Sequence, residues 1–396
     1  MKRALSGLPA TVWLLGLVSL FNDTASELIY PLVPLYLASV LMAGPKALGI
    51  IEGIAETVAS LLKLFSGIIA DRVHSAKFLV VGGYSLAALA RPLFALAASW
   101  PAVLLLRFMD RLGKGLRSSP RDAILASSVG ADRRGLAFGV QRTMDNAGAV
   151  IGPLAAAALL AAHMPLTHIF LWAAVPGAIT VLLVLGIKEP PRQHIPAKTP
   201  FSWNLQALPP RYKRHLLVLA LFTLGNSSNM FLLLRARDMG LAEYQVPLLW
   251  ATVSAVAMLF SAPLSALSDK VGRTRLIIIG WAVYGLFYLF MGLNGHSLWL
   301  LWPLFGFYGL FMAATEGAEK ALVADMAPPA LLGTAYGWFH LTTGFMLLPA
   351  SLLFGWLWQN FTPVSAFGFG AACAMLAAIL LKFWVPCERT GDACIS

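Results

Sequence analysis

The stretch GIIADRVHSAKFLVVGG, at residues 67–83, recurs at residues 265–281 as SALSDKVGRTRLIIIGW. In both copies apolar residues flank a short charged segment, and a shift of 198 residues, half the chain length, aligns Asp71 with Asp269. The same shift aligns RDAILA (121–126) with EKALVA (319–324), and GLAFG (135–139) with GTAYG (333–337). Similarity at one fixed spacing indicates that the chain is built from two related halves.

The composition is that of a membrane protein. Of the 396 residues, 59% are hydrophobic and only 12% are charged, whereas soluble domains carry about 25% charged residues. Apolar runs of about 20 residues recur along the chain, and each is long enough to cross a bilayer core as a helix. Alternating strand patterns do not occur, which argues against a membrane barrel. The sequence therefore predicts an all-α integral membrane protein.

The hydropathy pattern predicts twelve transmembrane helices in two sets of six. The expected spans are 9–42, 47–70, 77–99, 101–126, 135–162 and 165–187, then 214–238, 244–268, 274–294, 297–323, 332–358 and 363–386. We predict an N-terminal six-helix bundle (1–187), a Pro- and Lys/Arg-rich cytoplasmic linker (188–213), and a C-terminal six-helix bundle with a short cytoplasmic tail (214–396). A repeated set of six spans is typical of secondary transporters.

The formal net charge of +11 arises from basic residues between the spans. The positive-inside rule then predicts a multi-pass protein of the inner (plasma) membrane with both termini in the cytoplasm, and it explains the charge better than nucleic-acid binding does. The N-terminal apolar stretch has no small-residue cleavage site, so we expect it to be the first span. Cys373, Cys387 and Cys394 lack metal-ligand spacing, and no metal site is predicted.

The paired charged segments resemble the loop motif of the major facilitator superfamily, and the similarity covers the whole chain. Its residues are Gly67, Asp71, Arg72 and Lys77 in the first copy, and Ser265, Asp269, Lys270, Gly272, Arg273 and Arg275 in the second. The resemblance implies two pseudo-symmetric bundles that work by alternating access. It implies a cytoplasmic gate at Asp71, Arg72, Asp269, Lys270 and Arg273, to which we add the charged helix ends at Arg121, Asp122, Glu316 and Glu319. The alternative is that these charges only set the topology.

Two further motifs resemble the exporting, antiporter branches of that superfamily. DNAGAVIGPLAAA, at 145–157, matches their antiporter motif at Gly148, Gly152 and Pro153, although its last glycines are replaced by alanines. The alternative is ordinary small-residue packing. LLLRFMDRLGKGLRSSPRD, at 104–122, places Arg111 at the spacing from Gly115 that drug/proton antiporters show, with Arg107 one turn earlier on the same face.

The stretch FNDTASELIYPLVPLY, at 21–36, puts two carboxylates inside the first span. Asp23 and Glu27 are four residues apart and share a helix face, at a depth of about 20 Å from the helix start. A charge at the bilayer centre costs about 2.5–3.5 kcal/mol on insertion scales, so such residues turn inward. We predict Asp23 as the leading proton site, Glu27 as its partner or as a substrate contact, and Arg111 or Arg107, beside Asp110, as the counter-charge. A permanent ion pair and direct cation binding are the alternatives.

Polar residues at similar depth define an expected substrate cavity. The N-terminal half contributes mostly charged side chains, while the matching stretch TLGNSSNMF (223–231) is neutral. The expected cavity residues are Asn22, Tyr30, Glu56, Arg142, Asp145, Asn226, Asn229 and His340.

These features together predict a secondary transporter, most simply a proton-coupled exporter of small organic or drug-like compounds. The chain has no Gly-x-x-x-x-Gly-Lys-Ser/Thr loop and no hydrolase or metalloenzyme motif, so we expect no cofactor beyond the proton gradient and no enzyme activity. Its expected partners are a small-molecule substrate, protons and the bilayer, with no nucleic acid, and by analogy it is a monomer. An exporter of a metal ion or metal chelate and a lipid flippase remain alternatives.

Overall fold

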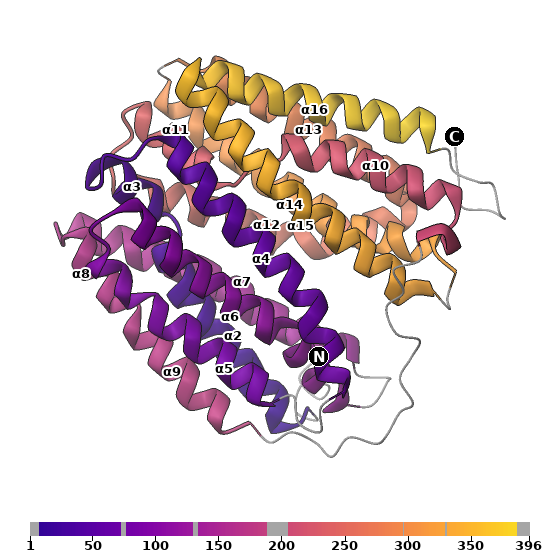
Figure 1. Ribbon diagram of the computed structural model, residues 1–396, viewed down its shortest axis with the longest axis horizontal. Coiled ribbons are helices and arrows are strands. Elements are labelled where there is room, and N and C mark those ends of the chain that lie inside the picture. The colour runs from indigo at the N-terminus through magenta and orange to yellow at the C-terminus, as the bar shows by residue number, and fades with distance from the viewer. Residues whose placement is uncertain are drawn as a thin grey trace. The chain divides into compact units, whose positions relative to one another are not determined.

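The computed structural model describes residues 8–72, 77–129, 134–187, 205–295, 297–328 and 331–385. Within these helices the side chains of 64, 67–72, 134–136, 262, 265–270 and 332–333 lie outside the described part. In the described ranges the regular structure is helical, without strands, which confirms the expected all-α class (Figure 1).

The chain divides into two compact units. Unit 1 comprises Met1–Leu41, Ile54–Lys198 and Glu243–Ala251, and unit 2 comprises Met42–Gly53, Thr199–Ala242 and Thr252–Ser396. Two long helices, α4 (Pro45–Arg72) and α12 (Gln245–Val271), therefore contribute residues to both units.

Unit 1 is a bundle of helices around an apolar core. Its other elements are α2 (Ala10–Ile29), α3 (Leu32–Ser39), α5 (Lys77–Ala90), η1 (Pro92–Leu96), α6 (Trp100–Ser127), α7 (Arg134–Ala161), α8 (Leu166–Trp172) and α9 (Ala174–Leu185). The helices α2 and α7 pack along each other, as do α5 and α6 (Figure 1). Fully buried Leu15, Val18 and Leu125 belong to one hydrophobic cluster between α2, α5 and α6.

Unit 2 has an aromatic interior. Its other elements are η3 (Leu205–Ala207), α10 (Pro210–Gly225), α11 (Met230–Asp238), α13 (Arg273–Leu293), α14 (Leu298–Met326), α15 (Leu332–Asn360) and α16 (Pro363–Trp384). The rings of Phe222 and Trp281 stack with centroids 4.3 Å apart, and Tyr284 stacks on Tyr288 at 4.2 Å. Rings of this size bury large apolar areas in few residues.

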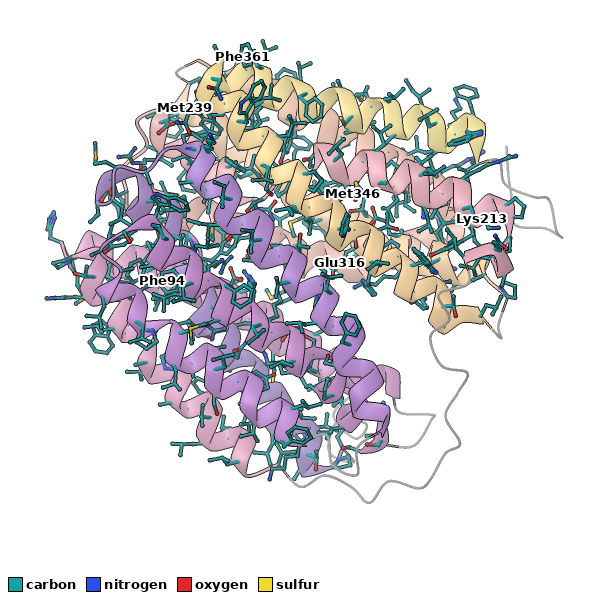
Figure 2. All side chains as sticks on the ribbon, viewed as in Figure 1. Phe94, Lys213, Met239, Glu316, Met346 and Phe361 are labelled. Atoms are coloured by element: carbon teal, nitrogen blue, oxygen red, sulfur yellow. The ribbon has the colours of Figure 1, made fainter. Side chains whose placement is uncertain are left out.

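The lengths and compositions of the helices suit a bilayer. In the described ranges, nine helical segments are long and apolar enough to span one. Over the same described ranges, the charged helices α4 and α6 and the long α12, whose described apolar part is Gln245–Ser261, bring the number of long segments to the expected twelve. Large apolar side chains on their outer faces are exposed, and Phe361, beyond the end of α15, is 61% exposed (Figure 2). Such exposure is expected of a surface that faces lipid.

Four of the twelve expected spans are interrupted: the third at Arg91, the sixth at Ala173, and the first and seventh as follows. The first breaks at Tyr30 and Pro31, because proline has no amide hydrogen to donate to the helix. The seventh breaks at residues 226–229, where the sequence has no proline. There the Ser228 hydroxyl accepts a hydrogen bond from the Met230 amide at 3.3 Å. Ser and Asn side chains bond to nearby backbone in this way and compete with the helix.

Candidate functional site

The helix α6 carries the cations of the site in unit 1. Residues 107, 110, 111 and 114 follow a spacing of three or four, so they lie along one side of α6. Arg107, Asp110 and Arg111 are all buried, with at most 4% of each residue exposed. Pro101 near the start of α6 favours helix initiation.

A buried ion-pair network centres on Asp110. Its carboxylate accepts from Arg91 Nε at 2.9 Å, and Arg107 lies 3.6 Å and Arg111 4.0 Å away. Arg91 Nη1 also donates to the backbone oxygen and the side-chain oxygen of Asn22, each at 3.1 Å. Arg91 therefore ties α2 to α6. Buried charges persist only when they are paired and hydrogen-bonded in this way.

A second pair joins α4 to α6. Arg111 Nε lies 2.8 Å from Glu56 Oε1, and the Glu56 side chain is 29% exposed. The two arginines that were expected as counter-charges of Asp23 thus contact other carboxylates, Glu56 and Asp110, in this structure.

Asp23 and Glu27 differ from these paired acids. Asp23 Oδ1 accepts from Asn22 Nδ2 at 2.7 Å, and Glu27 Oε2 accepts from the indole nitrogen of Trp250 at 2.8 Å. Among the described residues, no Lys, Arg or His nitrogen lies within 4.0 Å of either carboxylate. Both predicted proton sites therefore have neutral donors as direct partners.

Glu27 lies beside a pair of aromatic rings, one of which, Trp250, is its hydrogen-bond donor. The ring of Trp250 lies beside that of Tyr30, with centroids 5.1 Å apart, and the Arg107 guanidinium lies 5.2 Å from the Tyr30 ring centroid. Tyr30 and Trp250 are each 7% exposed. A cation over an aromatic face is attracted by the ring quadrupole.

The predicted antiporter motif packs directly on the helix that carries the acids. A Cβ atom at Gly152 would lie 2.7 Å from both the Thr24 oxygen and the Leu28 nitrogen, and one at Gly148 would overlap the Leu20 oxygen. Only glycine permits this approach of α7 to α2. Pro153 lies within α7.

Asp145 of α7 faces α6. Its carboxylate accepts from Gln141 at 3.0 Å and lies 3.9 Å from Arg121, while Gln141 also donates to the Ser19 hydroxyl at 3.0 Å. Arg142, which was expected in the cavity, has an exposed side chain. The structure thus groups Asp145 with α6 and α2.

Three of the expected cavity residues belong to unit 2. Asn226 and Asn229 lie at the break between α10 and α11, and the Asn229 side-chain oxygen accepts from the Tyr308 hydroxyl. Glu52 of α4, 1% exposed, accepts from the Ser228 hydroxyl at 2.9 Å at the same break. His340 is half-buried in α15, with its ring 5.3 Å from that of Phe339.

The expected gate residues are only partly described. The side chains of Asp71, Arg72, Asp269 and Lys270 lie outside the described part. Elsewhere, Arg121 pairs with its neighbour Asp122 at 2.8 Å, and Arg273 pairs with Asp325. The half-exposed Glu316 lies 3.4 Å from Lys320, and Glu319 accepts from the Trp281 indole at 2.9 Å.

Three residues that contact the site were not predicted as site residues from the sequence. Arg91 lies in an apolar span, where a lone charge could have identified it. Trp250 looked like any other aromatic residue of a membrane helix, and Gln141 carries no charge. The contacts of both come from tertiary packing, which leaves no local pattern in the sequence.

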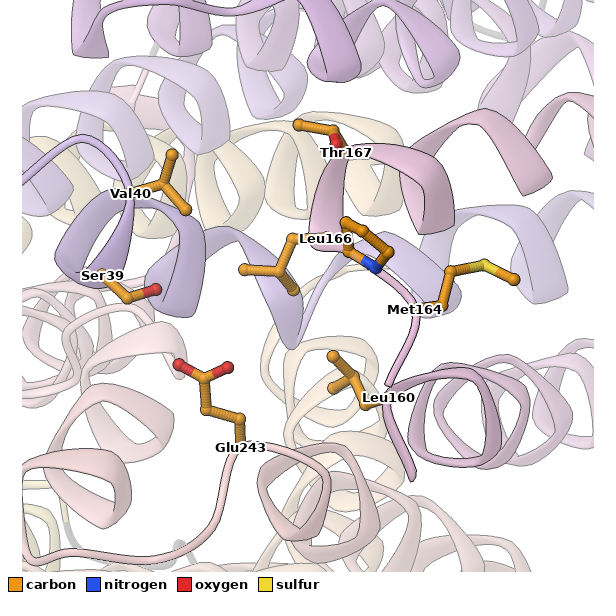
Figure 3. A pocket seen from close by; sticks show the side chains of 8 residues that line it. Ser39, Val40, Leu160, Met164, Leu166, Thr167 and Glu243 are labelled. Carbon is orange, nitrogen blue, oxygen red and sulfur yellow. The ribbon is translucent and has the colours of Figure 1, made fainter. Parts of the chain in front are cut away.

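A separate pocket of about 500 Å³ lies in unit 1, away from these residues. Leu160, Met164 and Leu166 line it together with Ser39, Val40, Pro165, Thr167 and Glu243. Figure 3 shows the Glu243 carboxylate across the pocket from Met164. None of the predicted site residues lines it.

Comparison with known proteins agrees with this architecture. The sequence matches the Major Facilitator Superfamily over residues 15–234 and 215–394. It is 34% identical over 385 residues to an MFS-type transporter of Methanocaldococcus jannaschii, covering 95% of each chain. It is 24% identical over 321 residues to the multidrug resistance protein MdtH of Proteus mirabilis, covering 80% of this chain and 79% of that protein.

Solved structures share the fold at low sequence identity. The nucleoside transporter NupG aligns with a TM-score of 0.80 at 16% identity and covers 94% of this chain and 98% of its own. A POT family transporter in complex with 5-aminolevulinic acid aligns with a TM-score of 0.80 at 13% identity, covering 96% of both chains. At these identities the likeness concerns the fold alone.

Proposed function

This chain belongs to the Major Facilitator Superfamily, and from that premise we propose that it is a proton-coupled exporter of small organic molecules. Membership makes the protein a multi-pass membrane transporter and not an enzyme, since its relatives and structural neighbours are transporters. What we propose beyond this is the coupling ion, the direction of transport and the class of substrate.

The contacts of Asp23 and Glu27 carry the proposal. Both acids accept hydrogen bonds from neutral groups, whereas Asp110 and Glu56 are paired with arginines. Protonating a paired carboxylate in a buried site leaves its arginine uncompensated, which is costly. Protonating Asp23 or Glu27 breaks no direct ion pair. These two carboxyls can therefore gain and lose a proton while the Asp110 network continues to hold α2 and α6 together.

Two observations support export of organic compounds. Gly148 and Gly152 let α7 contact α2 at the turns that carry Asp23 and Glu27, so the motif that resembles exporters adjoins the proposed proton site. Some relatives are multidrug resistance proteins. A metal ion or chelate as substrate has less support, because the described residues contain no group of three metal-binding acids, histidines or cysteines.

The proposal includes the membrane and the orientation. The basic segments between spans support an inner (plasma) membrane protein with both termini in the cytoplasm. The proton gradient across that membrane is the proposed driving force, and the monomer is the proposed working unit.

Proton movement in liposomes that contain the purified protein tests the proposal. We expect a panel of drug-like substrates to evoke counter-movement of protons in the wild type, and Asp23→Asn or Glu27→Gln to reduce it to the level of empty liposomes, since neither amide can bind the proton. The matched control is Asp238→Asn, which removes a carboxylate that pairs with Arg237 elsewhere, and which should behave as wild type. Substrate efflux by the wild type at a rate that does not depend on the pH gradient would overturn the proposed proton coupling.

A further inference from the structure

We propose that Trp250 is the residue that transmits the protonation of Glu27 to helix α12. The inference rests on the proposed proton coupling and adds a residue to it. In this role Trp250 binds neither substrate nor proton, and it acts by holding the Glu27 carboxylate.

Trp250 contacts Glu27 from a short, well-defined segment of α12. Trp250 lies in the short segment Glu243–Ala251 that belongs to unit 1, and the remainder of α12 belongs to unit 2. Its indole nitrogen donates to Glu27 Oε2 at 2.8 Å, and its ring lies beside Tyr30. The segment of α12 that packs within unit 1 is thus bonded directly to one of the two acids of the first span.

The charged groups around Glu27 come from α6 and from its own helix, α2. Arg107, Arg111 and Lys114 face it from α6, and Asp23 lies one turn earlier on α2. From α7, uncharged Gly152 packs against the Glu27 backbone. From α12, Trp250 is the donor. Replacing the indole therefore leaves every one of these charges in place, which makes the contribution of Trp250 separable.

The strength of the bond depends on the charge of Glu27. A hydrogen bond to an ionised carboxylate is roughly twice as strong as one between neutral groups. When Glu27 binds a proton, its oxygen becomes a neutral acceptor and the hold of Trp250 weakens. Proton binding would then loosen the start of α12 from α2, and proton release would fasten it again. A ligand shifts a conformational equilibrium only through such differential contacts.

Indole fluorescence of the purified protein tests the first half of the inference. Trp281 makes a second indole–carboxylate bond, to Glu319, so the measurement uses the Trp281→Phe background, which removes that contribution. We expect a pH-dependent emission component that disappears on adding Trp250→Phe and, independently, on adding Glu27→Gln. The two substitutions break the same bond from opposite sides, so a folding defect in one variant leaves the other informative. A Trp250 contribution that does not change with pH would overturn the inference.

Transport by Trp250→Phe tests the second half. We expect this variant to move substrate down its gradient while losing proton-driven movement against it, because the proton still binds but no longer controls α12. A wild type that moves no protons with any substrate would defeat the proposed function itself. A wild type that is coupled, beside a Trp250→Phe variant that is equally coupled, would defeat this inference alone.

Discussion

At the scale of single residues, the contacts of Arg91 indicate a structural role within unit 1. Arg91 bonds Asp110 and both oxygens of Asn22, and it is 3% exposed. It contacts neither Asp23 nor Glu27. These bonds indicate that Arg91 fixes α2 against α6. In the proposed function, Asp23 and Glu27 can then change charge while the bundle stays intact.

Substitution of Arg91 measures this structural role. We expect Arg91→Met to destabilise unit 1 by about 3–5 kcal/mol, because one partner of a buried pair would be left charged and undersolvated. The comparison is Arg237→Ala, which breaks an exposed pair with Asp238 and should cost about 0–1 kcal/mol. Thermal unfolding of the two variants in detergent separates these values. Equal stabilities would mean that the arginines on α6 compensate for Arg91.

Asp23, Glu27 and their partners show what a sequence can predict about such a site. The depth of Asp23 and Glu27 follows from their distance along an apolar span, and that is enough to nominate them. Their partners do not follow, because pairing is decided by which helix faces which. Arg111 has the expected spacing from Gly115 but contacts Glu56, and the donor to Glu27 comes from more than 200 residues away in sequence.

At the scale of helices, small residues determine how closely α2 and α7 approach. Gly148 and Gly152 each face backbone atoms of α2 where a methyl group has no room. The sequence analysis interpreted these glycines as an antiporter motif, with small-residue packing as the alternative, and the structure shows that they pack against α2. The break at 226–229 was not predicted, because the hydropathy of the seventh span continues through it without a proline.

Alanine substitutions at two glycines of α7 separate the effect of contact with α2 from the effect of alanine's higher helix propensity. We expect Gly152→Ala to force α7 away from α2, lowering stability by about 1–3 kcal/mol as overpacked cores do, and to reduce transport. Gly139→Ala lies on the same helix with nothing within 4 Å of its Cβ, so it should be neutral or stabilise by up to about 1 kcal/mol. Thermal unfolding and transport assays on the two variants measure these differences in stability and activity. A neutral Gly152→Ala would show that α7 can shift without loss.

At the scale of the whole molecule, the repeat of 198 residues was the most informative feature of the sequence. It predicted two sets of six helices, and membership of the superfamily together with the helical structure confirms the fold class. The boundaries of the bundles at 187 and 214 stay a prediction. The sequence could not foresee that residues 42–53 and 243–251 group with helices of the opposite half, because such grouping depends on side-chain contacts such as those of Glu52 and Trp250.

Orientation is a property of the whole chain that cysteine labelling can measure. With both termini in the cytoplasm, a membrane-impermeant maleimide should label Cys387 and Cys394 of the tail in inside-out vesicles and leave them unlabelled in intact cells. Buried Cys373 should stay unlabelled in both. In a variant with Cys387→Ser, Cys394→Ser and Gly295→Cys, the new thiol lies between α13 and α14, where a Cβ meets no atom within 4 Å. It should be labelled in intact cells, because the count of spans puts that connection outside. Labelling on the reverse sides would invert the topology and place the predicted gate at the external face.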